Sequence, residues 1–360
     1  MTKAKQWRVG IIGAGTVVTY GHIPNFQSVD NVEVVALCDV NQTRVQKVAT
    51  EYGIPHAYTD YREMLAKDAP DIVVVATPNV FHKPMTLDAL DAGAHVLCEK
   101  PLALHYADAE EMMAVAKEKG LVLTVGTHYR YSDPVQACKA HVDGGFLGKV
   151  YAARTSWQRR HGIPGYGSWF TNQEMAGGGA LLDIGIHALD RVLYLMGYPK
   201  PLRVVGATFA EFGPRGEGLF GWGVDGVDRG VQGVRFDVDD LTWAQIQFED
   251  GAVLHLNVAW ATHAPEEFRT QLYGTDGGLL LDGFDKYMLY QDLDGKPVDI
   301  TPEPPYGSGV SSYRRLVENF VRHLDGDPDA EIIPPEEALI GARIIDGILR
   351  SAESGREVAL

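Results

Sequence analysis

A histidine and an aspartate near the middle of the chain have the types and the spacing for acid–base chemistry. They lie in residues 180–196, a stretch of helical periodicity that is apolar on most sides. Its polar residues form one stripe at i, i+4, i+7, i+8 and i+11: Asp183, His187, Asp190, Arg191 and Tyr194. Such a stripe is most often a solvent-facing surface, but the preceding run of three glycines, 177–179, indicates backbone close to a ligand. Histidine suits proton transfer near neutral pH, so Asp183 and His187 are candidate catalytic residues.

A metal site on the same two side chains is the weaker interpretation. The sequence has no His-x-x-x-His or Cys-x-x-Cys cluster to supply further ligands. We therefore predict no metal.

Lys100 is a third candidate for chemistry. It lies between Glu99 and Pro101, directly after the apolar run 95–98, and the carboxyl end of a parallel strand is where ligands of open α/β sheets bind. A solvated surface lysine is the ordinary alternative. The proline that follows stiffens the backbone and fixes the direction of the chain at this point.

A glycine-rich turn near the N-terminus predicts a dinucleotide site. Residues 9–12 read as a strand and run into Gly13, Ala14, Gly15, Thr16 and Val17, where glycines permit a tight turn and a close approach to a pyrophosphate. The third position of the fingerprint is Val18 rather than glycine or alanine, so helix packing must differ there.

The second predicted strand ends at Asp39, 24 residues beyond Gly15, where an acid can accept from ribose hydroxyls and repel a 2′-phosphate. A turn or capping residue is the alternative for Asp39 alone. Strand, glycines and acid together favour NAD over NADP, although Arg44 leaves room for some NADP.

The first third of the chain alternates strand and helix patterns, which predicts βαβ units and a doubly wound parallel sheet. Helical stretches 43–52 and 84–92 are followed by Gly53 and Gly93, the residue type that ends helices. The expected strands are 9–12, 32–38, 72–76, 95–98 and 122–125.

The second part of the chain predicts an α+β domain with a mostly antiparallel, open sheet, in which Asp250-Gly251 is a hairpin turn. The expected strands are 150–158, 204–212, 241–248, 252–261, 270–273 and 279–281, and the expected helices are 180–196, 313–324 and 335–354. The glycine-rich stretch 213–233 is expected to be a long loop that covers an active site or contacts another subunit. The predicted domains are 1–130 for the dinucleotide, 131–334 for substrate and oligomerisation, and 335–360 as a C-terminal helix packing back on the body.

Composition fits a two-domain protein, since 360 residues at roughly 150 per domain suggest about two. The 48 Asp and Glu against 32 Lys and Arg give a net charge of −16, which disfavours nucleic acid as a partner. The N-terminus leaves no room for a signal peptide, no run is long enough for a membrane span, and three cysteines indicate a reducing compartment, so we expect a cytoplasmic protein and three core cysteines.

Several stretches together resemble the glucose-fructose oxidoreductase / inositol dehydrogenase / MocA family. They are residues 76–79 through His82, residues 93–102 with Glu-Lys-Pro at a strand end, Tyr129-Arg130, and residues 177–190. The resemblance implies a Rossmann domain, NAD as cofactor and homodimers or homotetramers through the open sheet. It also implies cofactor contacts from Thr77, Pro78, Asn79, His82, Glu99 and Lys100.

The family implies a chemical role for each catalytic candidate. His187 takes the proton from a secondary alcohol as hydride leaves for NAD, Asp183 orients substrate or imidazole, and Lys100 contacts the reacting hydroxyl and stabilises the developing alkoxide. The expected activity is a sugar, glycoside or cyclitol dehydrogenase. Two alternatives stay open, namely a glycosidase that recycles tightly held NAD and a non-catalytic NAD-dependent sugar sensor.

The segment 157–170, just ahead of the catalytic helix, is the predicted substrate region. Aromatic faces can stack on a sugar ring, and arginine and histidine can donate to hydroxyls or bind a carboxylate or phosphate. Packing between domains is the alternative. The candidates are Trp157, Arg159, Arg160, His161, Tyr166 and Trp169, joined by Tyr129, Arg130, Asp183 and His187.

Overall fold

The computed structural model describes residues 5–220, 234–303 and 307–360. The chain divides into two compact units, one of residues 1–126 with 313–339 and one of residues 127–312 with 340–360. This division differs from the predicted domains, because residues 313–339 group with the first unit and residues 127–130 and 340–360 group with the second. Trp7 Nε1 and Asn31 Nδ2 both donate to the carboxylate of Asp325, and Thr124 Oγ1 donates to the carbonyl of Ile333.

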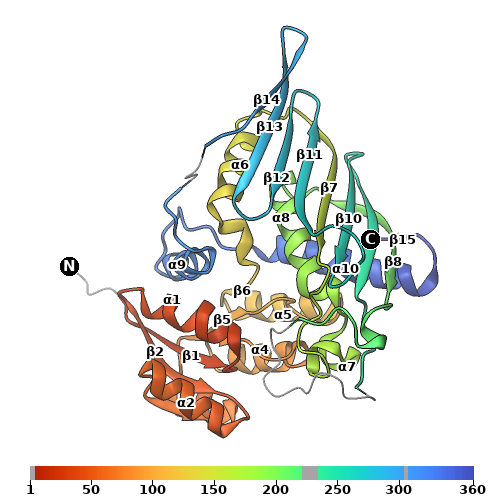
Figure 1. Ribbon diagram of the computed structural model, residues 1–360. Helices are drawn as coiled ribbons and strands as arrows, with labels where there is room; N and C mark the ends of the chain where they lie inside the picture. Colours follow the sequence, from red (N-terminus) through yellow and green to blue (C-terminus); the bar gives the residue numbers. More distant parts are fainter. Residues whose placement is uncertain (1–4, 221–233, 304–306) are drawn as a thin grey trace. The chain divides into compact units, whose positions relative to one another are not determined.

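The first unit contains the predicted parallel sheet, in the strand order β3-β2-β1-β4-β5-β6 (Figure 1). Its strands are β1 (Trp7–Ile12), β2 (Val32–Cys38), β3 (His56–Tyr58), β4 (Ile72–Val75), β5 (His95–Cys98) and β6 (Leu123–Val125). Its helices are α1 (Ile23–Gln27), α2 (Gln42–Tyr52), α3 (Tyr61–Asp68), α4 (His82–Asp91), α5 (Tyr106–Glu118) and α9 (Ser312–Leu324). The order reverses direction between β1 and β4, which is the switch point where doubly wound sheets bind their ligands.

The second unit contains a nine-stranded sheet in the order β14-β13-β12-β11-β7-β10-β9-β8-β15, in which only β7 and β10 pair in parallel. The strands are β7 (Val150–Gln158), β8 (Pro201–Phe209), β9 (Leu241–Phe248), β10 (Val253–Ala259), β11 (Glu267–Gly274), β12 (Gly278–Asp282), β13 (Lys286–Leu293), β14 (Lys296–Ile300) and β15 (Val358–Ala359). The helices are α6 (Asp133–Asp143), α7 (Gln173–Ala176), α8 (Ile186–Met196) and α10 (Pro335–Ser354). Helix α8 packs on β7, β10 and β11, and α6 lies beside α8 against β12 and β13 (Figure 1).

The predicted α/β class and both sheets are confirmed, and the element ends need corrections. Strand β8 begins and ends three residues earlier than the predicted 204–212, and the sequence reading had no β3, β13, β14 or β15. Of the predicted loop 213–233, residues 213–215 form a short 3₁₀ helix, while 221–233 lie outside the described residues. The three cysteines are buried and unpaired, as predicted. In the described part of the chain no helix is long and apolar enough to cross a membrane.

Candidate active site

The glycine-rich turn has the close backbone contacts that the sequence predicted. Gly13 has φ +109°, and a Cβ at this position would lie 2.2 Å from the carbonyl oxygen of Ala76, so no other residue fits. A Cβ at Gly15 would meet nothing within 4 Å, which leaves space beside this peptide. The turn continues into a π-helical turn over Val18–His22, where Val18 is fully buried in place of the usual small residue. Gly15, Thr16 and Val17 are partly or fully exposed, and their backbone fits a dinucleotide pyrophosphate.

The side chain of Asp39 makes the contacts of a turn residue, which was the alternative interpretation from sequence. Its Oδ2 accepts from the backbone N–H of Ala14 at 2.9 Å and its Oδ1 accepts from that of Asn41 at 2.8 Å. Arg44 Nη1 lies 3.6 Å from Oδ2. The carboxylate therefore fixes the glycine-rich turn against the start of α2, and contact with a ribose stays a prediction.

The loops after β4 and β5 are joined by a buried histidine. Nδ1 of His82 lies 2.7 Å from the carbonyl oxygen of Pro101, and its Nε2 lies 2.9 Å from that of Thr77. Burial lowers the pKa of His82 below its usual value, although the two carbonyls act in the opposite direction. Both ring nitrogens face carbonyls, and since the neutral ring has one N–H, His82 donates to one of the two loops and packs against the other. Of the other predicted cofactor residues, Asn79 is buried in a short 3₁₀ helix that follows Pro78.

Glu99 points into the first unit, and Lys100 follows it in a loop with a cis Lys100-Pro101 bond. Oε1 of Glu99 lies 2.8 Å from Nε2 of His22, and its Oε2 accepts from the backbone N–H of Lys100 at 3.1 Å. Both members of the pair are buried, whereas Lys100 is partly exposed. Glu99 thus bonds the backbone of Lys100 and helps to hold it in place. The sequence predicted Glu99 as a cofactor contact and did not indicate this role.

The predicted catalytic helix begins with a π-helical turn over Leu181–Gly185 and continues as α8. π turns are rare and occur frequently at functional sites. The stripe along it is not solvent-facing, because His187, Asp190 and Arg191 are all buried. His187 is therefore held within the unit, whereas Asp183 is partly exposed.

Gly178 and Gly179, just before this helix, lie close to protein atoms, and an approach of these glycines to a ligand stays a prediction. A Cβ at Gly179 would lie 1.9 Å from the carbonyl oxygen of Asp239 and 3.0 Å from the ring of Trp260. The buried carboxylate of Asp239 accepts from the backbone N–H of Gly179 at 2.6 Å and of Leu181 at 2.9 Å. Burial raises the pKa of Asp239, and these hydrogen bonds oppose the rise. The glycines permit this tight cap on the start of the helix.

Asp183 and His187 each have a defined neighbour. Nε1 of Trp260, a fully buried side chain, donates to Oδ2 of Asp183 at 2.9 Å. The ring of His187 meets Tyr129 edge-on at 4.8 Å between centroids, and Trp157 lies at 6.3 Å. The predicted substrate residues Tyr129 and Trp157 therefore lie beside the candidate base.

The remaining predicted substrate residues lie in different surroundings. Arg130 makes a buried ion pair with Asp190, to which Tyr198 also donates at 2.8 Å, so its charge is engaged inside the unit. Arg159 lies over Trp157 at 5.0 Å. Arg160 and His161 are exposed, Tyr166 is buried beside Phe236, and Trp169 stacks on Phe170 at 3.9 Å.

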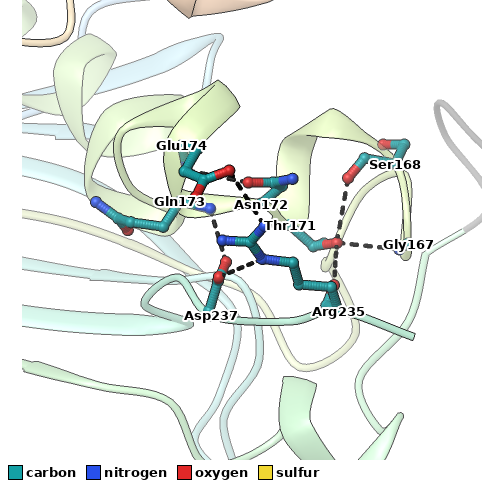
Figure 2. Close-up of polar contacts among 8 residues, drawn as sticks. All are labelled: Gly167, Ser168, Thr171, Asn172, Gln173, Glu174, Arg235 and Asp237. Carbon is teal, nitrogen blue, oxygen red and sulfur yellow. Dashed lines mark hydrogen bonds and ion pairs between the residues drawn. The ribbon is translucent and has the colours of Figure 1, made fainter. Parts of the chain in front are cut away.

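The segment that carries Trp169 is tied to residues 235–237 (Figure 2). Oγ1 of Thr171 accepts from the backbone N–H of Gly167 and donates to the carbonyl of Arg235, both at 3.0 Å. The guanidinium of Arg235 binds Asp237 at 2.6 Å and Glu174 at 3.3 Å, and Asp237 caps the N–H of Gln173 at 2.6 Å (Figure 2). These contacts join the segment that leads into the catalytic helix, residues 167–174, to residues 235–237.

Comparison with known proteins agrees with this geometry. Residues 7–127 match a family described as "Oxidoreductase family, NAD-binding Rossmann fold", and residues 135–280 match the GFO/IDH/MocA C-terminal domain. The chain belongs to the GFO/IDH/MocA oxidoreductase family. Its first unit is an NAD-binding Rossmann domain, and the protein is an NAD-dependent oxidoreductase.

Individual GFO/IDH/MocA relatives cover nearly all of the chain. It is 33% identical over 357 residues to D-glucoside 3-dehydrogenase of Escherichia coli (strain K12), covering 98% of this chain and 97% of the relative. It is 30% identical to levoglucosan dehydrogenase of Pseudarthrobacter phenanthrenivorans, over 84% of this chain and 82% of the relative. The crystal structure of aldose-aldose oxidoreductase from Caulobacter crescentus complexed with glycerol has a TM-score of 0.81 at 26% identity, covering 99% of this chain and 100% of that one.

The site contains three supporting side chains that were not predicted from the sequence: His22, Asp239 and Trp260. Each acts on a candidate residue or on the helix that carries one, across a long stretch of chain. The signal that could have indicated Asp239 is the pair of adjacent acids Asp239 and Asp240 directly before a predicted strand, and both are buried. No group of three His, Cys, Asp or Glu side chains within the described residues is arranged to hold a metal.

Proposed function

We propose that the protein oxidises a secondary hydroxyl group of a sugar or glycoside with NAD, and that Lys100, Asp183 and His187 are its catalytic residues. The observation that carries this proposal is the position of His187, which is buried against Tyr129 and Trp157 on the helix whose Asp183 is held by Trp260. A relative 33% identical over nearly the whole chain is named a glucoside dehydrogenase, which supports a carbohydrate substrate.

In this proposal each side chain has one task. The chemistry supplied by bound NAD is hydride acceptance at the nicotinamide. His187 removes the hydroxyl proton, and its largely apolar surroundings keep competing water away. Lys100 provides a positive charge for the developing alkoxide. Asp183, oriented by the indole N–H of Trp260, positions the substrate or the imidazole.

The cofactor residues follow from the same reasoning. Gly13, Gly15, Thr16 and Val17 provide the pyrophosphate cradle, and Asp39 with Arg44 stands where the adenosine ribose is expected. Thr77, Pro78 and Asn79, with Glu99 and His82 as supports, form the loops beyond β4 and β5. We place substrate contacts at Tyr129, Trp157 and Arg159, with Arg160, His161, Tyr166 and Trp169 as further candidates and Arg130 as a support of α8.

The decisive experiment follows reduced-nicotinamide absorbance with NAD or NADP and a panel of aldoses, glycosides, inositols and sugar phosphates. Turnover with a sugar or glycoside, lost in Lys100→Met and His187→Ala while NAD still binds, is the expected result. Full activity in both variants contradicts the catalytic assignment. Bond hydrolysis without NADH release indicates the glycosidase alternative, and ligand binding without turnover indicates a sensor. Activity on inositols alone favours a cyclitol enzyme.

We also propose a homodimer or homotetramer formed through the second sheet, in a cytoplasmic protein. Val205, Phe209 and Trp243 expose 46, 47 and 59% of their surface on the neighbouring strands β8 and β9, and Trp243 lies between the buried Thr242 and Ala244. An apolar group of this kind on a sheet face is typical of an interface. Trp243→Glu should produce monomers in analytical ultracentrifugation, and an unchanged mass would count against this face.

A further inference from the structure

Four aromatic rings form one cluster in the second unit beside His187. Trp157 stacks on Phe268 at 4.1 Å with an interplanar angle of 28°, and Phe284 lies 4.7 Å from Phe268. Tyr129 lies 5.4 Å from Phe284 and 4.8 Å from His187. The cluster is thus continuous from the turn between β12 and β13 to the candidate base.

Phe284 is the member of this cluster that meets solvent. Trp157 and Phe268 expose only 6 and 8% of their surface, whereas Phe284 exposes 52%. One face of its ring is therefore backed by other aromatic rings while much of the rest is open. An exposed apolar ring on a buried aromatic base is a surface on which another apolar face can pack.

A buried arginine fixes the turn that presents Phe284. Nη1 of Arg191 donates to the carbonyl of Gly283 at 3.0 Å, and the N–H of Gly283 donates to the carbonyl of Phe268 at 2.7 Å. The guanidinium also lies 3.6 Å from the ring centroid of Phe268, and its Nε donates to Thr270 at 2.9 Å. Burial lowers the pKa of Arg191 to about 9, which leaves it cationic at neutral pH. The N–H and the carbonyl of Gly283 are therefore both bonded, which fixes the backbone before Phe284.

We propose that Phe284, backed by Tyr129 and Phe268, is a platform for the apolar C–H face of a pyranose ring and selects pyranosides for the reaction at His187. The inference deepens the proposed function and rests on it for the identity of the base. Arg159, which lies over Trp157 and is partly exposed, supplies donors for ring hydroxyls at the same cluster. The pairing of an aromatic face with a nearby hydroxyl donor suits a ring that is apolar on one side and polar at its edge.

The test uses the full-length protein with NAD and methyl β-D-glucopyranoside as the probe, observed by saturation-transfer NMR. In wild type we expect the strongest saturation at the axial ring protons H-3 and H-5. In Phe284→Ala this saturation should fall about threefold or more, whereas Phe284→Trp should retain it. Leu293→Ala is the matched control, since Leu293 lies at the other end of β13 and is also 52% exposed.

Three results would overturn the platform. They are absence of ring-proton saturation in wild type, equal saturation in wild type and Phe284→Ala, and loss of a dimer in Phe284→Ala by ultracentrifugation, which would assign the ring to a second copy. NADH formation measured on the same samples separates this inference from the proposed function. If saturation depends on Phe284 but no NADH forms, the platform is supported and the proposed dehydrogenase activity is contradicted. We expect Phe284→Ala to raise KM about three- to tenfold. NADH formation with an unchanged KM in this variant would support the dehydrogenase and contradict the platform.

Discussion

Nε2 of His22 lies 2.8 Å from Oε1 of Glu99, and the pair connects the helix that follows the glycine-rich turn with the backbone of Lys100. A carboxylate only accepts, so His22 donates from Nε2, which agrees with the absence of a partner for its buried Nδ1 among the described residues. A Cβ at Gly126 would lie 2.9 Å from Glu99, so the carboxylate has little freedom to move. The position of Lys100 therefore depends on a buried hydrogen-bond chain that begins at the predicted pyrophosphate site.

Glu99→Gln should lower kcat about tenfold while the Kd for NAD changes less. In one orientation the amide N–H faces the N–H of Lys100. In the other it can donate only to Nε2 of His22, which moves the imidazole proton to the buried Nδ1, an atom without a partner among the described residues. Steady-state kinetics and NAD titration by fluorescence measure the two effects. Glu118→Gln, an exposed acid of the same unit, is the control, and equal kcat values in the two variants would show that the chain does not position Lys100.

The sheets were predictable from sequence because their signals are local. Apolar runs alternating with helical stretches, each closed by a glycine, specify the first sheet without knowledge of distant partners. Strands β13 and β14 escaped prediction because their exposed edge positions, such as Lys286 and Lys296, interrupt the apolar alternation, although Asp294-Gly295 is a hairpin turn.

The supports of the site were not predictable, because they depend on contacts between distant positions. His22 and Glu99, like Asp183 and Trp260, are 77 residues apart in the sequence. Nothing in the local pattern around Trp260 distinguishes it from an ordinary core tryptophan, and it reaches Asp183 only once β10 lies beside the catalytic helix. For the same reason, the contact of Gly179 with Asp239, 60 residues further along the chain, was not predictable from the glycines 177–179.

Trp260→Phe removes the indole N–H that binds Asp183 and leaves a cavity where part of the indole ring was. Loss of the indole donor frees the carboxylate to rotate, so kcat/KM should fall about tenfold while the thermal midpoint falls by only a few degrees. A double-mutant cycle with Asp183→Ala should be strongly non-additive, since each change removes the same hydrogen bond. Trp243→Phe, on the exposed face of β9, is the control. Additive effects in the cycle would mean that Trp260 serves packing alone.

His82 predicts a pH dependence of stability. Its pKa in the folded protein is lowered below the usual 6.5, so the unfolded chain binds a proton that the folded protein does not. The free energy of unfolding therefore rises with pH up to about 6.5 and is lost as the pH falls below that value, by at most about 1.4 kcal/mol per pH unit from this group.

Urea unfolding of wild type and His82→Gln between pH 5 and 7 measures this difference, a window set by the 6.5 reference value and the downward shift. The variant should be less stable near neutrality, because a carbonyl partner is lost, yet show a shallower pH slope. His161→Gln, an exposed histidine, should keep the slope of wild type. Identical slopes in all three proteins would place the neutral form of His82 in doubt.

Asp39→Asn should shift the cofactor preference towards NADP. The amide oxygen can still accept from the N–H of Ala14 or of Asn41 but not from both, so the turn loses one hydrogen bond, while the negative charge that opposes a 2′-phosphate is removed. The change also releases Arg44, whose Nη1 lies 3.6 Å from Oδ2, to meet a phosphate. The ratio of kcat/KM for NAD to that for NADP should fall at least about tenfold. Asp30→Asn, an exposed acid of the same unit, controls for net charge, and a matching ratio in the two variants would leave Asp39 with its turn-holding task alone.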